Sequence, residues 1–159
     1  MAALVRFFGN VSAFLCSALV VVVSMDALIR YFFNISYSWV IELEWHIFSL
    51  IFLLAFAYTL SKDRHVRVDI LYNRFLPETK KKLDIIGHLM FLIPWSILIF
   101  VTSWKFVQNS YLIGEGSPNP DGLPHRFVVK SAILIGFLLL LLQALLSIIQ
   151  DMIWLKQKK

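Results

Sequence analysis

Residues 39–75 read WVIELEWHIFSLIFLLAFAYTLSKDRHVRVDILYNRF, and the change of character within this stretch decides the fold class. Residues 39–60 are mainly apolar, with their charged residues near the start. A helix that crosses the hydrocarbon core of a bilayer needs about 20 such residues. Six of the eight residues from 62 to 69 are then charged or titratable. This pattern predicts a membrane-spanning helix over 39–60 that ends at a polar loop.

Three further segments have the length and composition of membrane spans, at about residues 11–29, 85–107 and 127–154. Of the whole chain, 59% is hydrophobic and 16% is charged, whereas soluble domains average about 45–50% and about 25%. The sequence therefore predicts an all-α integral membrane protein with four transmembrane helices. We expect residues 1–159 to form a single membrane domain, with the first span an uncleaved helix and not a signal peptide.

The basic residues are divided unequally between the two ends of these helices. Of the 15 lysines and arginines, 11 fall in the N-terminal segment, the loop at 61–84 and the C-terminal segment. Short loops rich in Lys and Arg remain cytoplasmic. We therefore expect both termini and the 61–84 loop to be cytoplasmic, with the loops at 30–38 and 108–126 on the outer side. This topology accounts for a pI near 9.5 without nucleic-acid binding.

Polar side chains cluster in the first turns of the second helix. Four of them recur at helical spacing and form one stripe: Glu42, Trp45, His46 and Ser49. The side chains of Glu42 and His46 are close enough to pair, whereas Glu44 points elsewhere. The stripe is compatible with interfacial anchoring, with helix or subunit contacts, or with an ion or proton site. The Glu-x-x-x-His spacing is a weak metal signal, because no second pair of ligands completes it.

Other residues carry structural expectations. Asp26 and Arg30 are four residues apart near the end of the first helix, so we expect an ion pair between them. Pro94 is expected to bend the third helix. Gln143 is a candidate for an interhelical hydrogen bond in the fourth helix. The single cysteine, Cys16, offers no disulfide framework.

The central polar loop allows two conformations and two roles. His65, Arg67 and Asp69 alternate with apolar residues, as in a short extended segment. In a helix, Arg64, Arg67 and Leu71 would share a face instead. The loop is either a solvated basic segment at the lipid surface or a docking surface for another membrane subunit. The following residues, LPETKKKLD, predict a helix start with Pro77 in the first turn.

The loop before the fourth helix has an unusual composition. Three prolines and three glycines fall within residues 114–124, which predicts a compact, turn-rich loop. Glu115 and Asp121 supply acidic groups, and His125 and Arg126 supply basic groups. Such a loop is either a docking face for a protein or a tight connector.

No motif in the chain points to catalysis. The sequence contains no nucleophile elbow, phosphate-binding glycine loop or dinucleotide fingerprint. We therefore expect no catalytic, cofactor or metal site.

Residues 30–72, RYFFNISYSWVIELEWHIFSLIFLLAFAYTLSKDRHVRVDILY, resemble the signature region of the DctQ-type small permease subunit of tripartite ATP-independent periplasmic (TRAP) transporters. An Arg-Tyr pair ends the first helix of that family, a Trp and acidic residues open the second, and a His-Val-Arg-Val-Asp type stretch follows it. Residues 113–145, IGEGSPNPDGLPHRFVVKSAILIGFLLLLLQAL, resemble its outer loop and the start of its fourth helix. The resemblance extends from about residue 4 to 150. Many members have adjacent acids where Leu43 separates Glu42 from Glu44 here.

The resemblance implies a non-catalytic, multi-pass subunit of the bacterial inner membrane, with the outer loops in the periplasm. A large multi-spanning subunit would hold the substrate and sodium sites and move as an elevator, while a periplasmic binding protein delivers an organic acid. The small subunit would brace the scaffold and help to dock the binding protein. Candidate contacts with the large subunit or between helices are Arg30, Glu42, Glu44, His46, Arg64, His65, Arg67, Asp69 and Gln143. Candidate docking residues for the binding protein are Tyr37, Glu115, Asp121, His125 and Arg126.

Two other readings compete with this one. In the first, the chain is a self-sufficient four-helix transporter that works as a dimer, with Glu42 as the coupling carboxylate. In the second, it is an assembly or accessory protein without a transport role. The sequence does not identify the substrate, because the family's discriminating groups lie in the other subunits.

Overall fold

The computed structural model of the chain describes residues 2–62, 72 and 75–158. Its elements are α1 (Ala2–Phe33), α2 (Ser38–Ser61), α4 (Pro77–Gly87), the π-helix η1 (His88–Leu92), α5 (Ile93–Leu112) and α6 (Phe127–Gln157). The predicted contacts at residues 64–69 lie outside the described residues.

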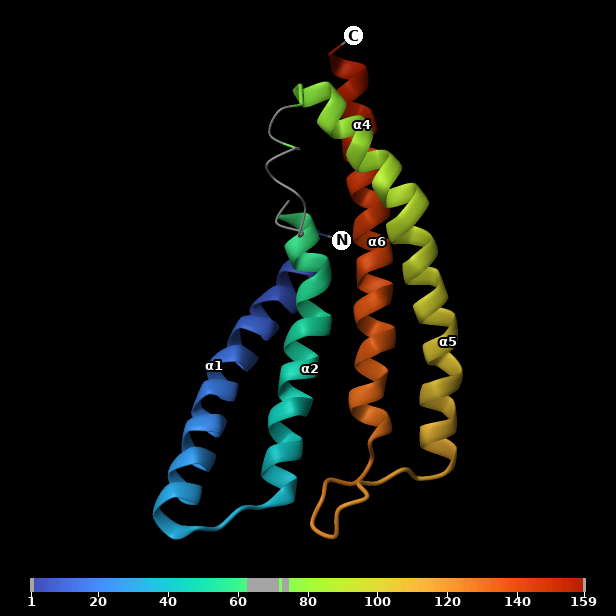
Figure 1. Cartoon of the computed structure of the whole chain (residues 1–159). Helices are drawn as coiled ribbons and strands as arrows, with labels where there is room; N and C mark the ends of the chain where they lie inside the picture. Colours follow the sequence, from blue (N-terminus) through green and yellow to red (C-terminus); the bar gives the residue numbers. More distant parts are fainter. Residues whose placement is uncertain (1, 63–71, 73–74, 159) are drawn as a thin grey trace.

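Within the described part of the chain, four helical segments are long and apolar enough to cross a membrane. They are Ala3–Phe33, Ser38–Ser61, Pro77–Leu112 and Phe127–Gln157. The prediction of an all-α chain with four candidate spans is therefore confirmed. Successive spans run in opposite directions, so both termini lie toward the same end of the helix assembly (Figure 1).

The spans form a single layer in the order α1, α2, α6, α5 (Figure 1). The principal contacts between the spans are those of α1 with α2, α2 with α6, and α6 with α5. Helices inside the layer are more buried than those at its edges. In the most apolar 18-residue window of each span, 33% of α6 is buried, against 11% of the first span and 6% of Pro77–Leu112. The layer consequently leaves many large apolar side chains exposed on the two helices at its edges, α1 and α5, among them Phe14, Val20, Trp95 and Val101.

The helices meet along seams of small and apolar residues. One buried cluster joins α1, α2 and α6 through Val5, Ala57 and Leu139, and another joins α2 to α6 through Leu60 and Ala144. In lipid, helix association depends on close packing and not on removal of apolar surface from water. The fit along these seams therefore decides how firmly the layer holds together.

A close approach of α2 and α6 is made possible by a glycine. A Cβ atom on Gly136 would lie 2.7 Å from the carbonyl oxygen of Leu53. Small residues are common at such sites because they let two backbones come together.

The third span changes its helical geometry before Pro94. Proline lacks the N–H that would bond to the carbonyl four residues earlier, and its ring would collide with that carbonyl. The chain widens into η1, where the N–H of Ile93 bonds to the carbonyl of His88, five residues back. Figure 1 shows that the axis changes direction between α4 and α5, in agreement with the predicted bend. The α4 helix begins at Pro77, at the predicted helix start.

Replacing Gly136 by alanine is expected to lower the stability of the chain, because the new methyl group meets a main-chain atom that cannot move aside. Overpacking of this kind typically costs about 1–3 kcal/mol. Thermal unfolding of the purified chain in detergent, followed by tryptophan fluorescence, should show a lower Tm.

Gly87→Ala is the matched control for this experiment. Gly87 also lies in a helix, and nothing lies within 4 Å of its Cβ position, so alanine should be neutral or favourable there. Equal Tm values for the two variants would contradict the close approach of α2 and α6.

Candidate functional site

The loop between α5 and α6 folds over the start of α2 and is held there by a buried carboxylate. Glu42 is only 3% exposed. Its Oε1 accepts hydrogen bonds from Ser117 Oγ and from Asn119 Nδ2, the latter at 3.0 Å. Its Oε2 accepts a hydrogen bond from the main-chain N–H of Leu123 at 2.7 Å. These donors compensate the cost of burying a charged group, so Glu42 fastens the loop to α2.

Hydrogen bonds within the loop shape the cradle around Glu42, which is formed by Ser117, Asn119 and Leu123. The N–H of Ser117 bonds to the carbonyl of Leu123 at 3.1 Å, and the N–H of Gly122 bonds to the carbonyl of Asn119 at 3.1 Å. A Cβ on Gly122 would lie 2.1 Å from Ser117 Oγ and 3.0 Å from Glu42 Oε1. Only glycine therefore fits at this position. The predicted compact, turn-rich loop is confirmed.

The C-terminal end of α5 leads directly into the cradle. The N–H of Glu115 bonds to the carbonyl of Ser110 at 3.0 Å, and the N–H of Gly114 bonds to the carbonyl of Tyr111 at 3.1 Å. These two bonds form a Schellman motif, in which a glycine takes the left-handed conformation. Gly114 has a φ of +61°. The helix end thus sets the direction in which the loop leaves α5.

A second ionic contact fixes the loop to α6. The carboxylate of Glu115 forms an ion pair with Lys130, and both side chains are largely buried. The hydrogen bond from Lys130 is the largest cause that holds the pKa of Glu115 below its ordinary value of 4.5. Lys130 Nζ also lies 3.9 Å from the centre of the Phe106 ring. The loop is therefore attached to both α2 and α6.

The side chains of Glu42 and His46 do not pair with each other, although their spacing would allow it. His46 Nδ1 contacts the main-chain carbonyl of Glu42 instead, and the His46 ring stacks on Trp45 with centroids 4.0 Å apart. The guanidinium of Arg126 lies 5.5 Å from the Trp45 ring centre. Residues of α2 thus hold the loop through a carboxylate and an aromatic ring.

The five candidate docking residues divide into two groups. Glu115 and Arg126 are partly buried and take part in the contacts that hold the loop. Tyr37, Asp121 and His125 are exposed. The α1–α2 connection and the α5–α6 loop lie at the same end of the layer (Figure 1). The exposed group is therefore available to a partner at that end.

The remaining candidate contacts have different surroundings. Arg30 forms the predicted ion pair with Asp26 at 2.7 Å, and Asp26 is 3% exposed. Glu44 is half-buried, and within the described residues its Oε1 has no hydrogen-bond partner. Gln143 donates to Ser147 Oγ at 3.4 Å within α6, in place of the predicted interhelical bond.

Sequence reasoning identified Glu42 but missed its partners, which are Ser117, Asn119 and Leu123. These residues lie 75 to 81 positions further along the chain. The turn residues around Gly122 were a usable signal for a compact loop, but nothing local indicated which carboxylate the loop would cover. Among the residues that the structure describes, no group of His, Cys, Asp and Glu could hold a metal ion.

Comparisons with known proteins relate this architecture to a transporter family. A family profile described as "Tripartite ATP-independent periplasmic transporters, DctQ component" matches residues 19–153. The C4-dicarboxylate TRAP transporter small permease protein DctQ of Vibrio cholerae serotype O1 is 24% identical to the chain over 116 residues. The alignment covers 70% of the chain and 50% of that protein, so the chain spans about half the length of this relative.

Replacing Glu42 by glutamine is expected to loosen the loop. The carboxylate accepts hydrogen bonds on both oxygens, whereas one end of a glutamine amide is a donor and would face another donor. Leaving a buried polar group unsatisfied costs about 1–3 kcal/mol. Hydrogen exchange of the Leu123 amide should accelerate by about tenfold or more.

Asp121→Asn is the matched control, because it makes the same change from acid to amide at an exposed position of the same loop. Its exchange pattern should resemble that of the wild type. Wild-type exchange rates in Glu42→Gln would show that the carboxylate does not hold the loop.

Proposed function

The chain belongs to the DctQ component family of tripartite ATP-independent periplasmic transporters, and we propose that it is the small permease subunit of a sodium-driven uptake system for an organic acid. In this proposal, a large multi-spanning subunit carries substrate and sodium, and a periplasmic binding protein delivers the substrate. The chain is a transporter subunit and not an enzyme. It braces the scaffold of the large subunit and contributes to the surface on which the binding protein docks.

The observation that carries this role is the single layer of helices. A layer one helix thick has two broad faces. The spans at the two edges of the layer keep large apolar side chains exposed on the described surface. Such a chain is suited to extend the wall of a larger membrane protein. Its seams are packed with small residues, so the layer keeps its form while its faces contact lipid or a partner.

The proposed orientation rests on the distribution of charge. Lys62, Lys81 and Lys158 all belong to the end of the layer at which the termini lie. Lys81 forms an ion pair with Asp151 at 2.6 Å, which attaches α4 to α6 at this end. By the positive-inside rule, we place this end in the cytoplasm and the loop held by Glu42 in the periplasm.

The proposed docking surface consists of the exposed residues Tyr37, Asp121 and His125. His125 has a φ of +60°, a backbone conformation that few residues other than glycine adopt. The contacts of Glu42 and Glu115 fix the backbone beneath this surface. A rigid surface that carries the negative charge of Asp121 can select a partner by electrostatic complementarity.

Contacts with the large subunit are proposed at two levels of the layer. Glu44, Arg30 and His46 lie near the outer end, and Glu44 has an unsatisfied oxygen among the described residues. Buried polar atoms are usually hydrogen-bonded, so Glu44 is the strongest candidate for a donor from the partner. Arg64, His65, Arg67 and Asp69 remain proposed contacts on the cytoplasmic side.

The substrate is proposed by analogy alone. The Vibrio cholerae relative is described as a C4-dicarboxylate transporter protein. A C4-dicarboxylate is therefore the first organic acid to test with the complete system.

The competing proposal, a self-sufficient dimeric transporter, requires Glu42 to be available for ion or proton coupling. The described structure instead engages both of its oxygens with the outer loop. Its place in the first turns of α2 also sets it near one end of the span. Both observations favour a structural role for this carboxylate.

Affinity purification of the tagged chain from its native membranes is expected to recover a large multi-spanning protein in near-equal amount. Mass spectrometry identifies that protein, and membranes with the untagged chain provide the control. Recovery of the chain alone as a stable dimer, together with transport by that dimer in liposomes, would contradict the subunit proposal.

Reversing the charge of Asp121 with lysine is expected to weaken docking of the loaded binding protein. Rim charges act mainly on association, so uptake should fall several-fold at limiting binding protein and recover when that protein is saturating. Glu78→Lys, at the opposite end of the layer, is the control. Equal uptake by Asp121→Lys and wild type at every concentration would remove Asp121 from the docking surface.

A further inference from the structure

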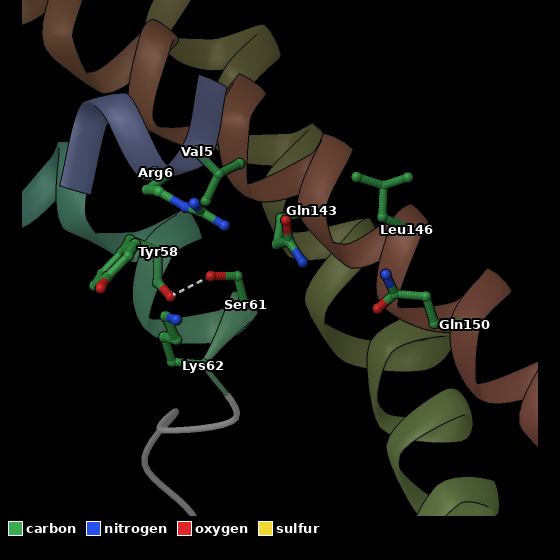
Figure 2. A pocket seen from close by; sticks show the side chains of 8 residues that line it. All are labelled: Val5, Arg6, Tyr58, Ser61, Lys62, Gln143, Leu146 and Gln150. Atoms are coloured by element: carbon green, nitrogen blue, oxygen red, sulfur yellow. Dashed lines mark hydrogen bonds between the residues drawn. The ribbon is translucent and has the colours of Figure 1, made fainter. Parts of the chain in front are cut away.

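A small cavity lies between α1, α2 and α6 at the end of the layer where the termini lie (Figure 2). Its volume is about 170 Å³. Arg6 and Lys62 lie on one side, from α1 and the end of α2, and Gln143 and Gln150 of α6 lie on the other. The described lining thus combines two cations and two amides and includes no carboxylate.

The two cations are not neutralised by described residues of the chain. The ion pairs of the described chain involve other lysines and arginines. Lys62 Nζ lies 5.7 Å from the centre of the Tyr58 ring, and no described carboxylate forms an ion pair with it. Two positive charges that line one cavity favour an anion within it.

Gln143 is the buried component of the cavity wall. Its side chain is 5% exposed. Its Nε2 is 3.4 Å from Ser147 Oγ, a long separation for a hydrogen bond. A buried amide with spare hydrogen-bonding capacity is available to a bound ligand.

The position along the helices indicates which anion would reach the cavity. Arg6 lies near the start of the first apolar span, and Lys62 follows the last residue of the second. Basic residues at the ends of spans lie at the level of the lipid headgroups. Leu146 adds an apolar side chain to the lining of the cavity. The cavity therefore offers cations beside a surface suited to an acyl chain.

We propose that this cavity binds the phosphate group of an anionic phospholipid, such as phosphatidylglycerol, and that the lipid bridges α1 and α2 to α6. A phosphodiester carries one negative charge, and its oxygens accept hydrogen bonds from guanidinium, ammonium and amide donors. Free inorganic phosphate shares this chemistry, but the level of the cavity in the membrane favours the lipid.

The test uses the full chain in nanodiscs that contain phosphatidylcholine and phosphatidylglycerol. Native mass spectrometry then measures which lipid remains bound after release of the chain. Wild type should retain phosphatidylglycerol selectively, and Arg6→Gln/Lys62→Gln should lose this selectivity by on the order of 30-fold, since each basic residue contributes about fivefold.

Two variants keep the result interpretable. Lys80→Gln/Lys82→Gln removes the same charge at the same end of the layer but outside the cavity lining, and it should retain phosphatidylglycerol like the wild type. Gln143→Leu keeps both cations and should lower retention by a few-fold. Circular dichroism and size-exclusion chromatography verify that each variant is folded.

A second measurement distinguishes the lipid from free phosphate. The chain in phosphatidylcholine alone is titrated with inorganic phosphate while its Tm is recorded, and no shift is expected at millimolar concentration. The proposal is overturned if phosphatidylglycerol retention is equal in the wild type and the cavity variant. It is also overturned if inorganic phosphate raises the Tm of the wild type alone and no lipid is retained.

Discussion

A carboxylate that is buried at the boundary of a membrane needs hydrogen-bond donors, and in this chain the donors come from a distant loop. Glu42 receives them from Ser117, Asn119 and Leu123, which lie 75 to 81 residues further along. Because this loop also joins α5 to α6, satisfying one side chain of α2 brings both halves of the chain together at this end of the layer. The Glu115–Lys130 ion pair then holds the same loop to α6. The arrangement of the layer at this end follows from one unfavourable burial and the contacts that offset it.

The two ends of the layer are built on different principles. At the end with the α5–α6 loop, polar contacts between the loop, α2 and α6 fix the backbone and leave a few exposed residues above it. At the opposite end, apolar clusters around Ala57 and Ala144 join the helices, and the Lys81–Asp151 ion pair secures α4. The cations that line the cavity at this end have no acidic counterpart in its described lining. The end with the α5–α6 loop suits recognition of a protein, whereas the end with the termini, whose described cavity lining has cations and no carboxylate, suits contact with anionic lipid.

The sequence predicted the helices well because the thickness of a bilayer imposes a length that apolar runs must reach. It also predicted the Asp26–Arg30 pair and the bend near Pro94, which depend on spacing and on the chemistry of one residue. It did not predict which atoms Glu42 would contact. Neighbours at i and i+4 on a helix are close, but proximity does not decide whether His46 meets a side chain or a main-chain carbonyl. Long-range partners leave no periodic signal, so the cradle around Glu42 required the structure.

The exposure of large apolar residues has a different meaning here than in a soluble protein. Lipid solvates such residues, so the helices gain little by burying them, and the seams use small residues that allow close contact. Gly136 and Ala132 are examples on α6, and Ser96, Ser103 and Ser110 recur every seventh residue on the buried side of α5. Close seams hold the helices together edge to edge, and large residues remain on the faces. This division explains how four helices form a layer instead of a closed bundle. It also gives the chain a broad surface for a partner without any loss of its own packing.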